Sequence, residues 1–269
     1  MKKKWTGERL ETFIYTRDAI DHLHRYAIVR EYVNNKNVLD IASGEGYGSN
    51  LISEIASTVI GVDIDEESIK KASLKYKKNN LTFKVGRADL IPVNDNSIDV
   101  VVSFETLEHH DKHQEMFLEI KRVLKSDGIV IMSTPDKLYY TDKRNFKNEF
   151  HVKELYKSEF IDLISTNFKN YQLLNQSYIN GNSIIQEDNA NQVKTFFTGN
   201  YNELMTIALE PLYLIAISSN INFEKQKNSI FNGHDIVENE MNARYRKSNS
   251  FKLGNFILSP IKLIKKLKK

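Results

Sequence analysis

The chain has 269 residues, of which 41% are hydrophobic and 27% are charged, and this composition predicts a globular protein with one sizeable core. It holds no cysteine, which excludes disulfide bonds and thiolate metal sites and agrees with a reducing cytoplasm. No segment reaches the ~18 uninterrupted apolar residues of a membrane-spanning helix, and no apolar signal stretch follows the lysine-rich residues 1–4.

The first predicted element is a helix over residues 8–33, where apolar residues recur at helical spacing. From residue 37 onward, short apolar strands alternate with helices. The strands are expected at 37–41, 58–62, 81–85, 97–103 and 129–133, and the helices between them at 47–56, 66–77 and 114–124. This alternation predicts an α/β fold whose parallel sheet is covered by helices on both faces.

Beyond these units, a helix is expected at 152–167 and two more strands at 171–178 and 212–218, which makes seven strands. The polar stretch 180–202 is expected to be irregular. The chain is therefore divided into three parts. They are an N-terminal helical cap at 1–36, a sheet domain at 37–220 and a basic C-terminal extension at 221–269.

The C-terminal extension concentrates the positive charge. After Glu240 there are nine basic residues and no acidic one, whereas the preceding part carries 29 basic against 35 acidic residues. A helix with Leu and Ile on one side and lysines on the other could lie on the anionic inner face of the membrane. It could equally pack on its own domain or on a dimer partner. Pro260 is expected to interrupt any single long helix.

The strand at 37–41 runs into a G-x-G-x-G turn at 44–48 and then into a helix. Glycines let the backbone approach a ligand, and a helix N-terminus presents free N–H groups, so a nucleotide-like ligand is expected here. Three acids at strand ends favour S-adenosylmethionine over NAD. Asp40 precedes the turn, Asp63 could accept hydrogen bonds from both ribose hydroxyls, and Asp89 could accept one from an adenine amino group.

The order of these motifs resembles the class I S-adenosylmethionine-dependent methyltransferases. VLDIASGEGYG, GVDID, RAD, SFETLEHH and KRVLKSDGIVIMSTPD follow one another, and the resemblance covers about residues 20–220. It implies a Rossmann-like domain with a mostly parallel seven-stranded sheet, N-terminal helices and a C-terminal helical extension. It also implies that S-adenosylmethionine is bound and leaves as S-adenosylhomocysteine.

The same resemblance assigns individual residues to the cofactor. Gly44 and Gly46 would line the methionine moiety, with Asp40 just behind it, and Phe104 would lie near the sulfonium. Arg25 would either reach the methionine carboxylate or lie on the surface. The full set is Arg25, Asp40, Ala42, Gly44, Gly46, Asp63, Ile64, Ala88, Asp89 and Phe104.

A second group of polar residues follows the strand at 97–103. Glu105, Glu108 and His109 stand at positions i, i+3 and i+4, so in a helical turn their side chains would share one face. Two carboxylates and an imidazole suit a divalent cation. His151, after the next strand, is a fourth candidate, because loops after neighbouring parallel strands open at the same sheet edge.

The ExxEH pattern with a downstream histidine resembles ubiquinone-biosynthesis O-methyltransferases and small-RNA 2′-O-methyltransferases. That resemblance implies that the four residues hold Mg2+, Mn2+ or Zn2+, which would lower the pKa of a hydroxyl and orient it for attack. Two other interpretations stay open. In one, His109 is a metal-free general base and the glutamates cap a helix or bind substrate; in the other, the set is structural. The neighbouring His110 and His113 are expected to face solvent.

The segments STPDKLYYTDKRNFKNEFHVKELYKSEF and NEMNARYRKSNSFKLGNFILSPIKLI resemble proteins of bacterial cell-surface glycan assembly. The resemblance implies a sugar hydroxyl on a nucleotide-sugar or lipid-linked glycan as the acceptor, with glycosyltransferases as partners. A phenol- or quinone-type acceptor, an RNA and a non-catalytic binding role are the alternatives. The acidic body, without a basic stripe interleaved with aromatics, disfavours nucleic acid.

Overall fold

The computed structural model describes residues 10, 12, 15–188 and 196–266. Its strands are β1 (Asn37–Ile41), β2 (Thr58–Asp63), β3 (Leu81–Val85), β4 (Ile98–Phe104), β5 (Leu124–Pro135), β6 (Asn170–Ile179), β7 (Asn182–Glu187), β8 (Phe196–Gly199), β9 (Leu204–Ile207), β10 (Tyr213–Ser219) and β11 (Ser229–Asn232). Its helices are α1 (Arg17–Val29), α2 (Tyr47–Ile52), α3 (Glu66–Lys75), α4 (His113–Val123), α5 (Lys157–Asn167), α6 (His234–Lys247) and α7 (Asn249–Lys266). A 3-10 turn, η1 (Leu107–His109), and a π turn, η2 (Leu138–Asp142), complete the set.

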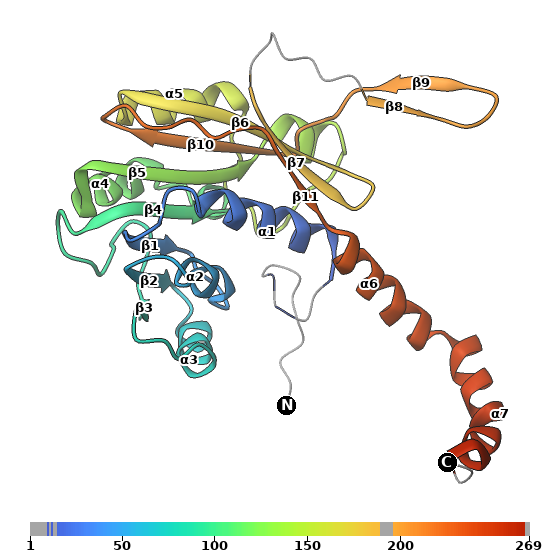
Figure 1. Ribbon diagram of the computed structural model, residues 1–269. Helices are drawn as coiled ribbons and strands as arrows, with labels where there is room; N and C mark the ends of the chain where they lie inside the picture. The colour runs from blue at the N-terminus through green and yellow to red at the C-terminus, as the bar shows by residue number, and fades with distance from the viewer. Residues whose placement is uncertain (1–9, 11, 13–14, 189–195, 267–269) are drawn as a thin grey trace.

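In this part of the chain nine strands form one sheet, in the order β11-β7-β6-β10-β5-β4-β1-β2-β3 (Figure 1). β1 to β5 pair in parallel, and β10 runs antiparallel between β5 and β6. The predicted Rossmann-like class I methyltransferase fold is confirmed. The sheet has two strands more than the expected seven, because β7 folds back on β6 and β11 pairs with β7.

Helices cover both faces of the sheet. Apolar side chains of α4 and α5, such as Phe117 and Phe160, pack with Leu39 on one face. Those of α1 and α2, such as Val29 and Ile52, pack on the other. The central strand β4 is buried along almost its whole length, as its nearly continuous apolar sequence predicts.

The β6–β7 hairpin joins the strand that was expected at 171–178 to a strand in the stretch 180–202 that was expected to be irregular. Its two-residue turn is Asn180-Gly181, with φ values of 46° and 86°, and this pair is a strong hairpin signal. Behind the turn, Ser183, Ile184 and Ile185 are buried. The expectation was wrong because the many polar residues masked this local turn chemistry.

Two other expected boundaries differ from the structure. α1 begins at Arg17 rather than at residue 8, after an extended Thr16; residues 8, 9, 11, 13 and 14 of that expected helix lie outside the described residues. The backbone of α7 stays helical through residue 260, so the expected interruption there was wrong. A proline removes one hydrogen bond but does not by itself end a helix that has already formed.

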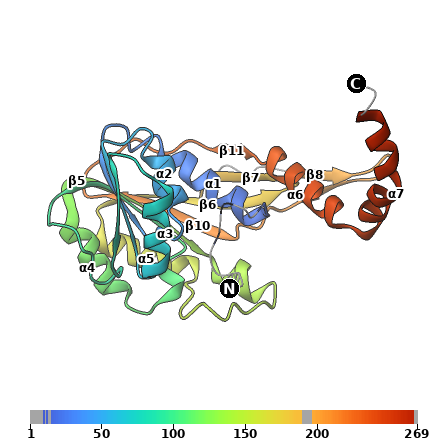
Figure 2. The ribbon, with the colours of Figure 1, turned by 90° about the horizontal axis from the view of Figure 1, so that it is seen from below.

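Two segments project away from the sheet. The β8–β9 hairpin and the α6–α7 arm both extend to the same side of the molecule (Figures 1 and 2). α6 buries none of its residues. Among the described residues, no helix is both long enough and apolar enough to span a membrane.

Candidate active site

The loop between β1 and α2 presents its backbone to an open space. Ala42, Gly44 and Gly46 have φ values of 59°, 55° and 82°, in the left-handed region that favours glycine. Asp63, at the end of β2, holds this loop: its Oδ2 accepts a hydrogen bond from the Gly44 N–H at 2.8 Å. A Cβ built at Gly44 would meet nothing within 4 Å, so a ligand can approach the backbone there.

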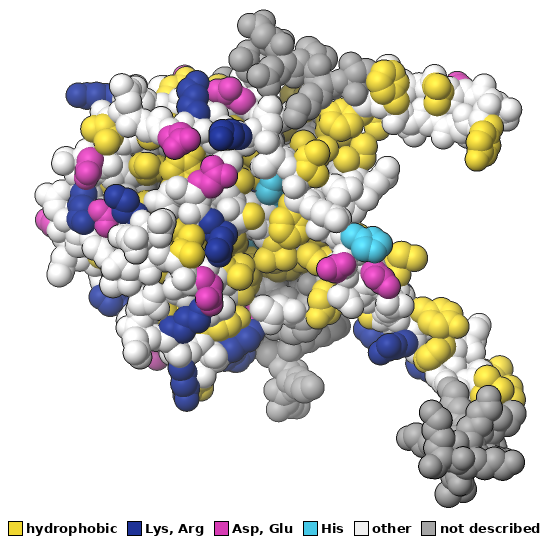
Figure 3. Space-filling model, viewed as in Figure 1, with side chains coloured by type: hydrophobic (Ala, Val, Ile, Leu, Met, Phe, Trp, Pro, Cys, Tyr) yellow, Lys and Arg dark blue, Asp and Glu magenta, His cyan; other side chains and the backbone are white. Residues whose placement is uncertain are grey.

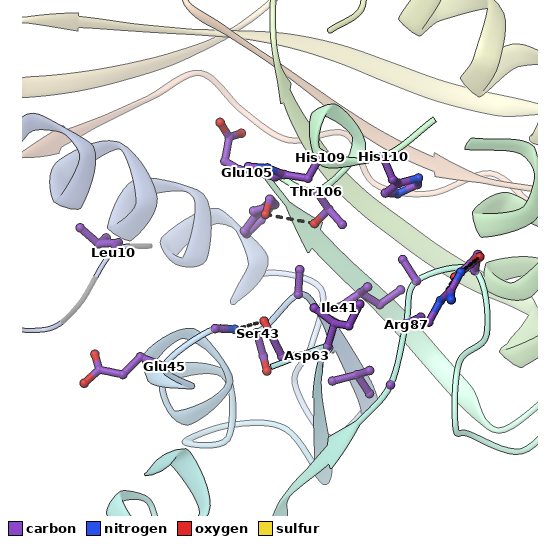
Figure 4. A pocket seen from close by; sticks show the side chains of 18 of the residues that line it. Leu10, Ile41, Ser43, Glu45, Asp63, Arg87, Glu105, Thr106, His109 and His110 are labelled. Carbon is purple, nitrogen blue, oxygen red and sulfur yellow. Dashed lines mark hydrogen bonds and ion pairs between the residues drawn. The ribbon is translucent and has the colours of Figure 1, made fainter. Parts of the chain in front are cut away.

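The open space is a cleft of about 380 Å³ at the carboxyl ends of β1, β2 and β4, where ligands bind in open α/β sheets. Figure 4 shows Ser43 and Asp63 on one side and Glu105, Thr106 and His109 across from them. Seven of the ten residues predicted to bind the cofactor line this cleft. They are Ala42, Gly44, Asp63, Ile64, Ala88, Asp89 and Phe104.

Asp40 and Gly46 lie behind the wall of the cleft. Asp40 is 1% exposed and accepts a hydrogen bond from the Ser49 hydroxyl at 2.6 Å. Burial raises the pKa of Asp40 to about 7, against the opposing effect of that hydrogen bond. A Cβ at Gly46 would lie 2.7 Å from the ring of Phe83 and 2.9 Å from Ala72, so the loop packs tightly on the layer beneath it.

Arg25 lies neither on the surface nor on the wall of the cleft. It is fully buried, forms an ion pair with Glu105 and donates a hydrogen bond to the Ser133 hydroxyl at 2.9 Å. Its guanidinium lies 4.7 Å from the ring centroid of Tyr213. Nε and Nη2 of Arg25 have no hydrogen-bond partner among the described residues. The surface interpretation of Arg25 was wrong, because α1 presses this face onto the ends of the central strands.

Asp89 lies in the cleft between two cations. Its carboxylate accepts hydrogen bonds from Arg87 Nε at 2.7 Å and Lys112 Nζ at 3.0 Å. The hydrogen bond from Arg87, with help from Lys112, holds the pKa of Asp89 well below its usual range. Asp89 therefore stays ionised, and after a further bond from Arg87 Nη2 its Oδ1 keeps one lone pair for an amino group in the cleft.

Three of the four predicted metal ligands meet at the edge of the cleft. Glu108, His109 and His151 each offer a ligand atom, and these atoms lie within 4.8 Å of one another. Glu105 does not join them. It has a φ of 51° and precedes η1, so it is not in a helical turn with the others, and its carboxylate faces Arg25 instead. The expectation of one shared helical face was wrong for Glu105.

Partners on the Nδ1 atoms orient both imidazoles. His109 Nδ1 lies 3.1 Å from the carbonyl oxygen of Phe150, so a proton there leaves the lone pair on Nε2. His151 Nδ1 lies 2.5 Å from Glu154, and its Nε2 lies 3.0 Å from the amide nitrogen of Asn148. Carbonyl and carboxylate partners of this kind are typical of metal-binding histidines. A cation on Nε2 of His151 would have to displace the Asn148 amide.

Glu108 is a buried acid at the centre of this cluster. It is 1% exposed, and the Thr134 hydroxyl lies 3.3 Å from its Oε2. Burial, together with the nearby charge of Glu105, raises the pKa of Glu108 well above its usual value. A carboxylate in such a place needs either a proton or a cation beside it. The set of one carboxylate and two imidazoles therefore fits a divalent transition metal.

A comparison with protein families gives the identity of the domain. A family model described as a methyltransferase domain matches residues 33–200, which is more than half of the chain. The chain belongs to this methyltransferase family. The match begins just before β1, so it contains the glycine loop. It also contains Glu108, His109 and His151, which we call the metal-competent cluster.

Individual relatives agree with this assignment. A probable S-adenosylmethionine-dependent methyltransferase of Mycolicibacterium smegmatis is 34% identical over 49% of this chain and 51% of its own length. A ubiquinone biosynthesis O-methyltransferase of Pelagibacter ubique is 28% identical over 39% of this chain and 44% of its own. The chain thus spans about half the length of the curated relatives it matches. The crystal structure of the YcgJ protein from Bacillus subtilis has the same fold, with a TM-score of 0.55 and 21% identity over 74% of this chain and 99% of its own.

The methyltransferase domain also brings residues to the cleft that the sequence interpretation did not include. His22 and Tyr47 line it together, with the Tyr47 hydroxyl 2.9 Å from His22 Nδ1. Burial lowers the pKa of His22 well below its usual value, with a smaller contribution from Arg25. Tyr47 stands inside the glycine motif and could have been found there. His22 could not, because only tertiary packing brings α1 over the loop.

His110 and His113 differ from the solvent-facing side chains that were expected. His110 lines the cleft of the methyltransferase domain. His113 is 5% exposed, and its Nε2 lies 2.8 Å from the carbonyl oxygens of Leu107 and His110. The expectation was wrong because His113 begins α4 and bonds back to the open end of η1.

A second cavity, of about 500 Å³, lies on the other side of the metal-competent cluster. Its lining consists of Arg17, Asp18, Tyr140, Arg144, Phe146, Lys147, Asn148, Glu149, Phe150, Leu212 and Tyr213. His151 lies between a residue that lines the cleft and one that lines this cavity. Its ring lies 5.2 Å from that of His109, which lines the cofactor cleft, and 5.3 Å from that of Tyr140, which lines the second cavity.

Proposed function

We propose that this chain is an S-adenosylmethionine-dependent O-methyltransferase that acts on a sugar hydroxyl of a surface-glycan precursor. One observation carries the proposal: His109 both lines the cleft beside the glycine loop and belongs to the Glu108–His109–His151 cluster. A group that can take a proton thus stands at the edge of the space where the methyl donor would bind. The family match and the curated relatives support the methyl donor.

The cleft residues have the chemistry that S-adenosylmethionine requires. Asp63 accepts hydrogen bonds from the Gly44 N–H at 2.8 Å and from the Asp65 N–H at 2.9 Å, and its carboxylate, which lines the cleft, would face the ribose hydroxyls. Ala88 and Asp89 would flank the adenine, and Phe104 would lie near the sulfonium. When bound, the donor supplies a methyl group on a positively charged sulfur.

The transfer balances as a single displacement. The acceptor oxygen forms a bond to the methyl carbon, the carbon–sulfur bond breaks, and its electron pair stays on sulfur as S-adenosylhomocysteine leaves. In the metal-free form, His109 Nε2, which carries the lone pair of the ring when the Nδ1 proton points to the Phe150 carbonyl, takes the hydroxyl proton. In the cation-assisted form, the acidified hydroxyl gives its proton to water. Glu108 and His151 hold the imidazole and the acceptor oxygen in place.

A divalent cation held by Glu108, His109 and His151 would lower the pKa of the acceptor hydroxyl. With Glu105 engaged by Arg25, the donor set has two nitrogens and one oxygen. Zn2+ and Mn2+ suit that set better than Mg2+, which prefers oxygen ligands. The cation-assisted and the metal-free forms differ in one result: exhaustive dialysis against a chelator abolishes activity in the first and leaves it unchanged in the second.

A quinone-type phenol is the second candidate acceptor. The likeness to a ubiquinone biosynthesis O-methyltransferase favours it. The polar and charged lining of the second cavity supports the sugar instead. We further propose that the α6–α7 arm holds the enzyme at an anionic membrane surface, near glycosyltransferases that would supply its glycan.

The proposal is tested in two steps. Calorimetry with S-adenosylmethionine measures the first, with Asp63→Asn as the variant that should weaken binding. Mass spectrometry then follows the gain of one methyl group on nucleotide-sugars, lipid-linked glycans and catechol-type phenols. We expect the native chain to methylate a sugar. We expect His109→Gln to lose this activity but to keep its cofactor binding. Methylation of phenols alone would make the second candidate correct, and binding without any transfer would make the chain a non-catalytic relative.

A further inference from the structure

We infer that the second cavity binds the diphosphate-linked part of the acceptor, so that the enzyme selects an anionic sugar conjugate over a free sugar or a neutral phenol. The inference rests on the proposed function, because it places the acceptor next to the metal-competent cluster. It goes further in naming the chemical group that is recognised and the residues that recognise it.

Arg144 is the main phosphate-binding candidate. Its guanidinium lies 5.3 Å from the ring centroid of Tyr140 and 5.2 Å from that of Phe146. Within the described parts of the chain it forms no ion pair, so its N–H groups are not occupied by a carboxylate. An arginine oriented by aromatic rings offers a planar set of donors that matches phosphate oxygens in pairs.

Two further cations border the same space. Lys147 is exposed and, among the described residues, has no ion pair either. Arg17 lies at the first position of α1, 4.8 Å from the ring centroid of Tyr178, and its Nε donates to Asp21 at 3.3 Å. The terminal nitrogens of Arg17 are left for a ligand. The N-terminal end of α1, which carries a partial positive charge, adds to their field.

The cavity also contains the carboxylates of Asp18 and Glu149, so it is not a uniformly positive surface. This mixture fits a ligand with two kinds of polar group. Arginine and lysine donate to phosphate oxygens, whereas carboxylates and the amide oxygen of Asn148 accept hydrogen bonds from sugar hydroxyls. A neutral phenol would gain nothing from these exposed charged groups, whereas a diphosphate would form charge-assisted hydrogen bonds with the cations among them.

A chain of neighbouring rings leads from the second cavity to His109 at the cofactor cleft. Tyr140 forms its wall and stacks on His151, with ring planes 25° apart. His151 in turn lies edge-on to His109. A sugar that extends from a diphosphate at Arg144 along Tyr140 would therefore present a hydroxyl to His109 at the cofactor cleft.

The test measures binding directly, without methyl transfer. Calorimetry compares inorganic pyrophosphate, UDP-glucose, a short-chain prenyl-diphosphate glucose and free glucose. We expect pyrophosphate and both conjugates to bind more tightly than glucose, and Arg144→Gln to weaken them about tenfold, as loss of a charge-assisted hydrogen bond would. Arg30→Gln, a change at an exposed arginine outside the cavity, is the matched control and should leave binding unchanged. The Arg144→Gln variant should also keep its affinity for S-adenosylmethionine, and this result would show that the variant is folded.

The outcomes separate the inference from the proposed function. If Arg144→Gln leaves the binding of pyrophosphate and conjugates unaltered, or if glucose binds as well as UDP-glucose, the inference is wrong even where sugar is methylated. If the cavity binds pyrophosphate through Arg144 but no acceptor is methylated, the proposed function fails instead. Tighter binding of UDP-glucose identifies a nucleotide source for the diphosphate, and tighter binding of the prenyl conjugate identifies a lipid source.

Discussion

The glycines of the loop between β1 and α2 differ in what an added side chain would meet. Gly44 and Gly46 both have positive φ, so alanine brings a similar backbone cost of about 1–2 kcal/mol at either position. A Cβ at Gly44 enters open space, but one at Gly46 meets Phe83 at 2.7 Å. We expect Gly46→Ala to lower the melting temperature clearly more than Gly44→Ala.

The same pair separates folding from cofactor binding. Gly44→Ala should weaken S-adenosylmethionine binding in calorimetry although the domain stays folded. The reason is that Gly44 lines the cleft and Gly46 does not. Both variants carry the same backbone cost of alanine at a positive φ, so each one serves as the control for the other. Equal losses of stability, or a Gly44→Ala variant with unchanged affinity, would contradict this division.

Asp40 should make the stability of the domain depend on pH. Its pKa is about 7 in the folded state and near 3.8 in the unfolded chain, because burial disfavours its charge. Between these values the folded state keeps a proton that the unfolded state has lost. The free energy of unfolding therefore falls as pH rises from about 4 to about 7, by at most ~1.4 kcal/mol per pH unit, and levels off above.

Asp40→Asn removes this contribution. In urea unfolding from pH 5 to pH 8, the stability of the variant relative to the native chain should rise up to about pH 7 and then stay constant. The comparison isolates Asp40 from other buried acids such as Glu108, which titrate in both proteins. Parallel stability curves would show that Asp40 is not the titrating group.

The sequence predicted the residues of the site better than their partners. Seven expected cofactor residues line one cleft, because motifs at the carboxyl ends of parallel strands must meet there. The pairing of Glu105 with Arg25, 80 residues away, depends on how α1 packs on the sheet. A helical spacing rule could not reveal it, because a positive φ takes Glu105 out of the helical turn.

At the scale of elements, alternation and apolar runs located the central strands within a residue or two, except β5, which starts five residues before its expected range. β7 and its turn with β6 were missed because their signal is only the pair Asn180-Gly181 in a polar stretch. β11 could not be expected either. Its pairing with β7, 42 or more residues earlier in the chain, places part of the expected extension 221–269 in the sheet. The three-part division of the chain stays a prediction.

The segment between β5 and α5 contains only the short turn η2, yet this segment positions His151. Glu154 holds it by accepting from His151 Nδ1 and from the Thr141 hydroxyl, both at 2.5 Å. Glu154→Gln should lower Zn2+ or Mn2+ affinity about 10- to 100-fold, the usual effect of losing the outer partner of a ligand. Metal titration of the dialysed protein measures it. Binding of S-adenosylmethionine should not change.

Glu159→Gln is the matched control for this change. Glu159 lies at the start of α5 and accepts from the Tyr156 N–H at 2.8 Å, a contact that glutamine can also make. It should keep full metal affinity. If Glu154→Gln binds the ions as well as the native chain, His151 is not a ligand; if the native chain binds neither ion, the metal-assisted form of the mechanism is wrong.

At the scale of the whole molecule, the active site and the arm lie apart. The β8–β9 hairpin and the α6–α7 arm both carry apolar side chains on their surfaces, with a hollow between them (Figure 3). On α7, Leu253 and Ile257 are 61% and 62% exposed, and six basic residues follow residue 248. A helix with apolar and basic residues is suited to the surface of an anionic membrane rather than to its interior. The backbone of α7 continues past residue 260 to residue 266, so the helix is longer than the sequence alone suggested.

Removal of residues 249–269 tests this proposal. The native chain should sediment with vesicles that contain phosphatidylglycerol but not with phosphatidylcholine vesicles, and added salt should release it, because lysines supply much of the attraction. The shortened chain should lose this binding but keep its affinity for S-adenosylmethionine, since α7 packs on α6 through Phe251 and Tyr245 and does not reach the cleft.

A substitution within the intact arm separates apolar insertion from charge alone. Leu253→Ser with Ile257→Ser keeps every lysine and should still reduce vesicle binding, because buried apolar area adds to the electrostatic attraction. Leu74→Ser, at a side chain that is 65% exposed on α3, is the control and should have no effect. If the shortened chain instead keeps its vesicle binding, the arm is not the membrane contact. If it changes from dimer to monomer in light scattering, the arm serves as a contact between protein subunits.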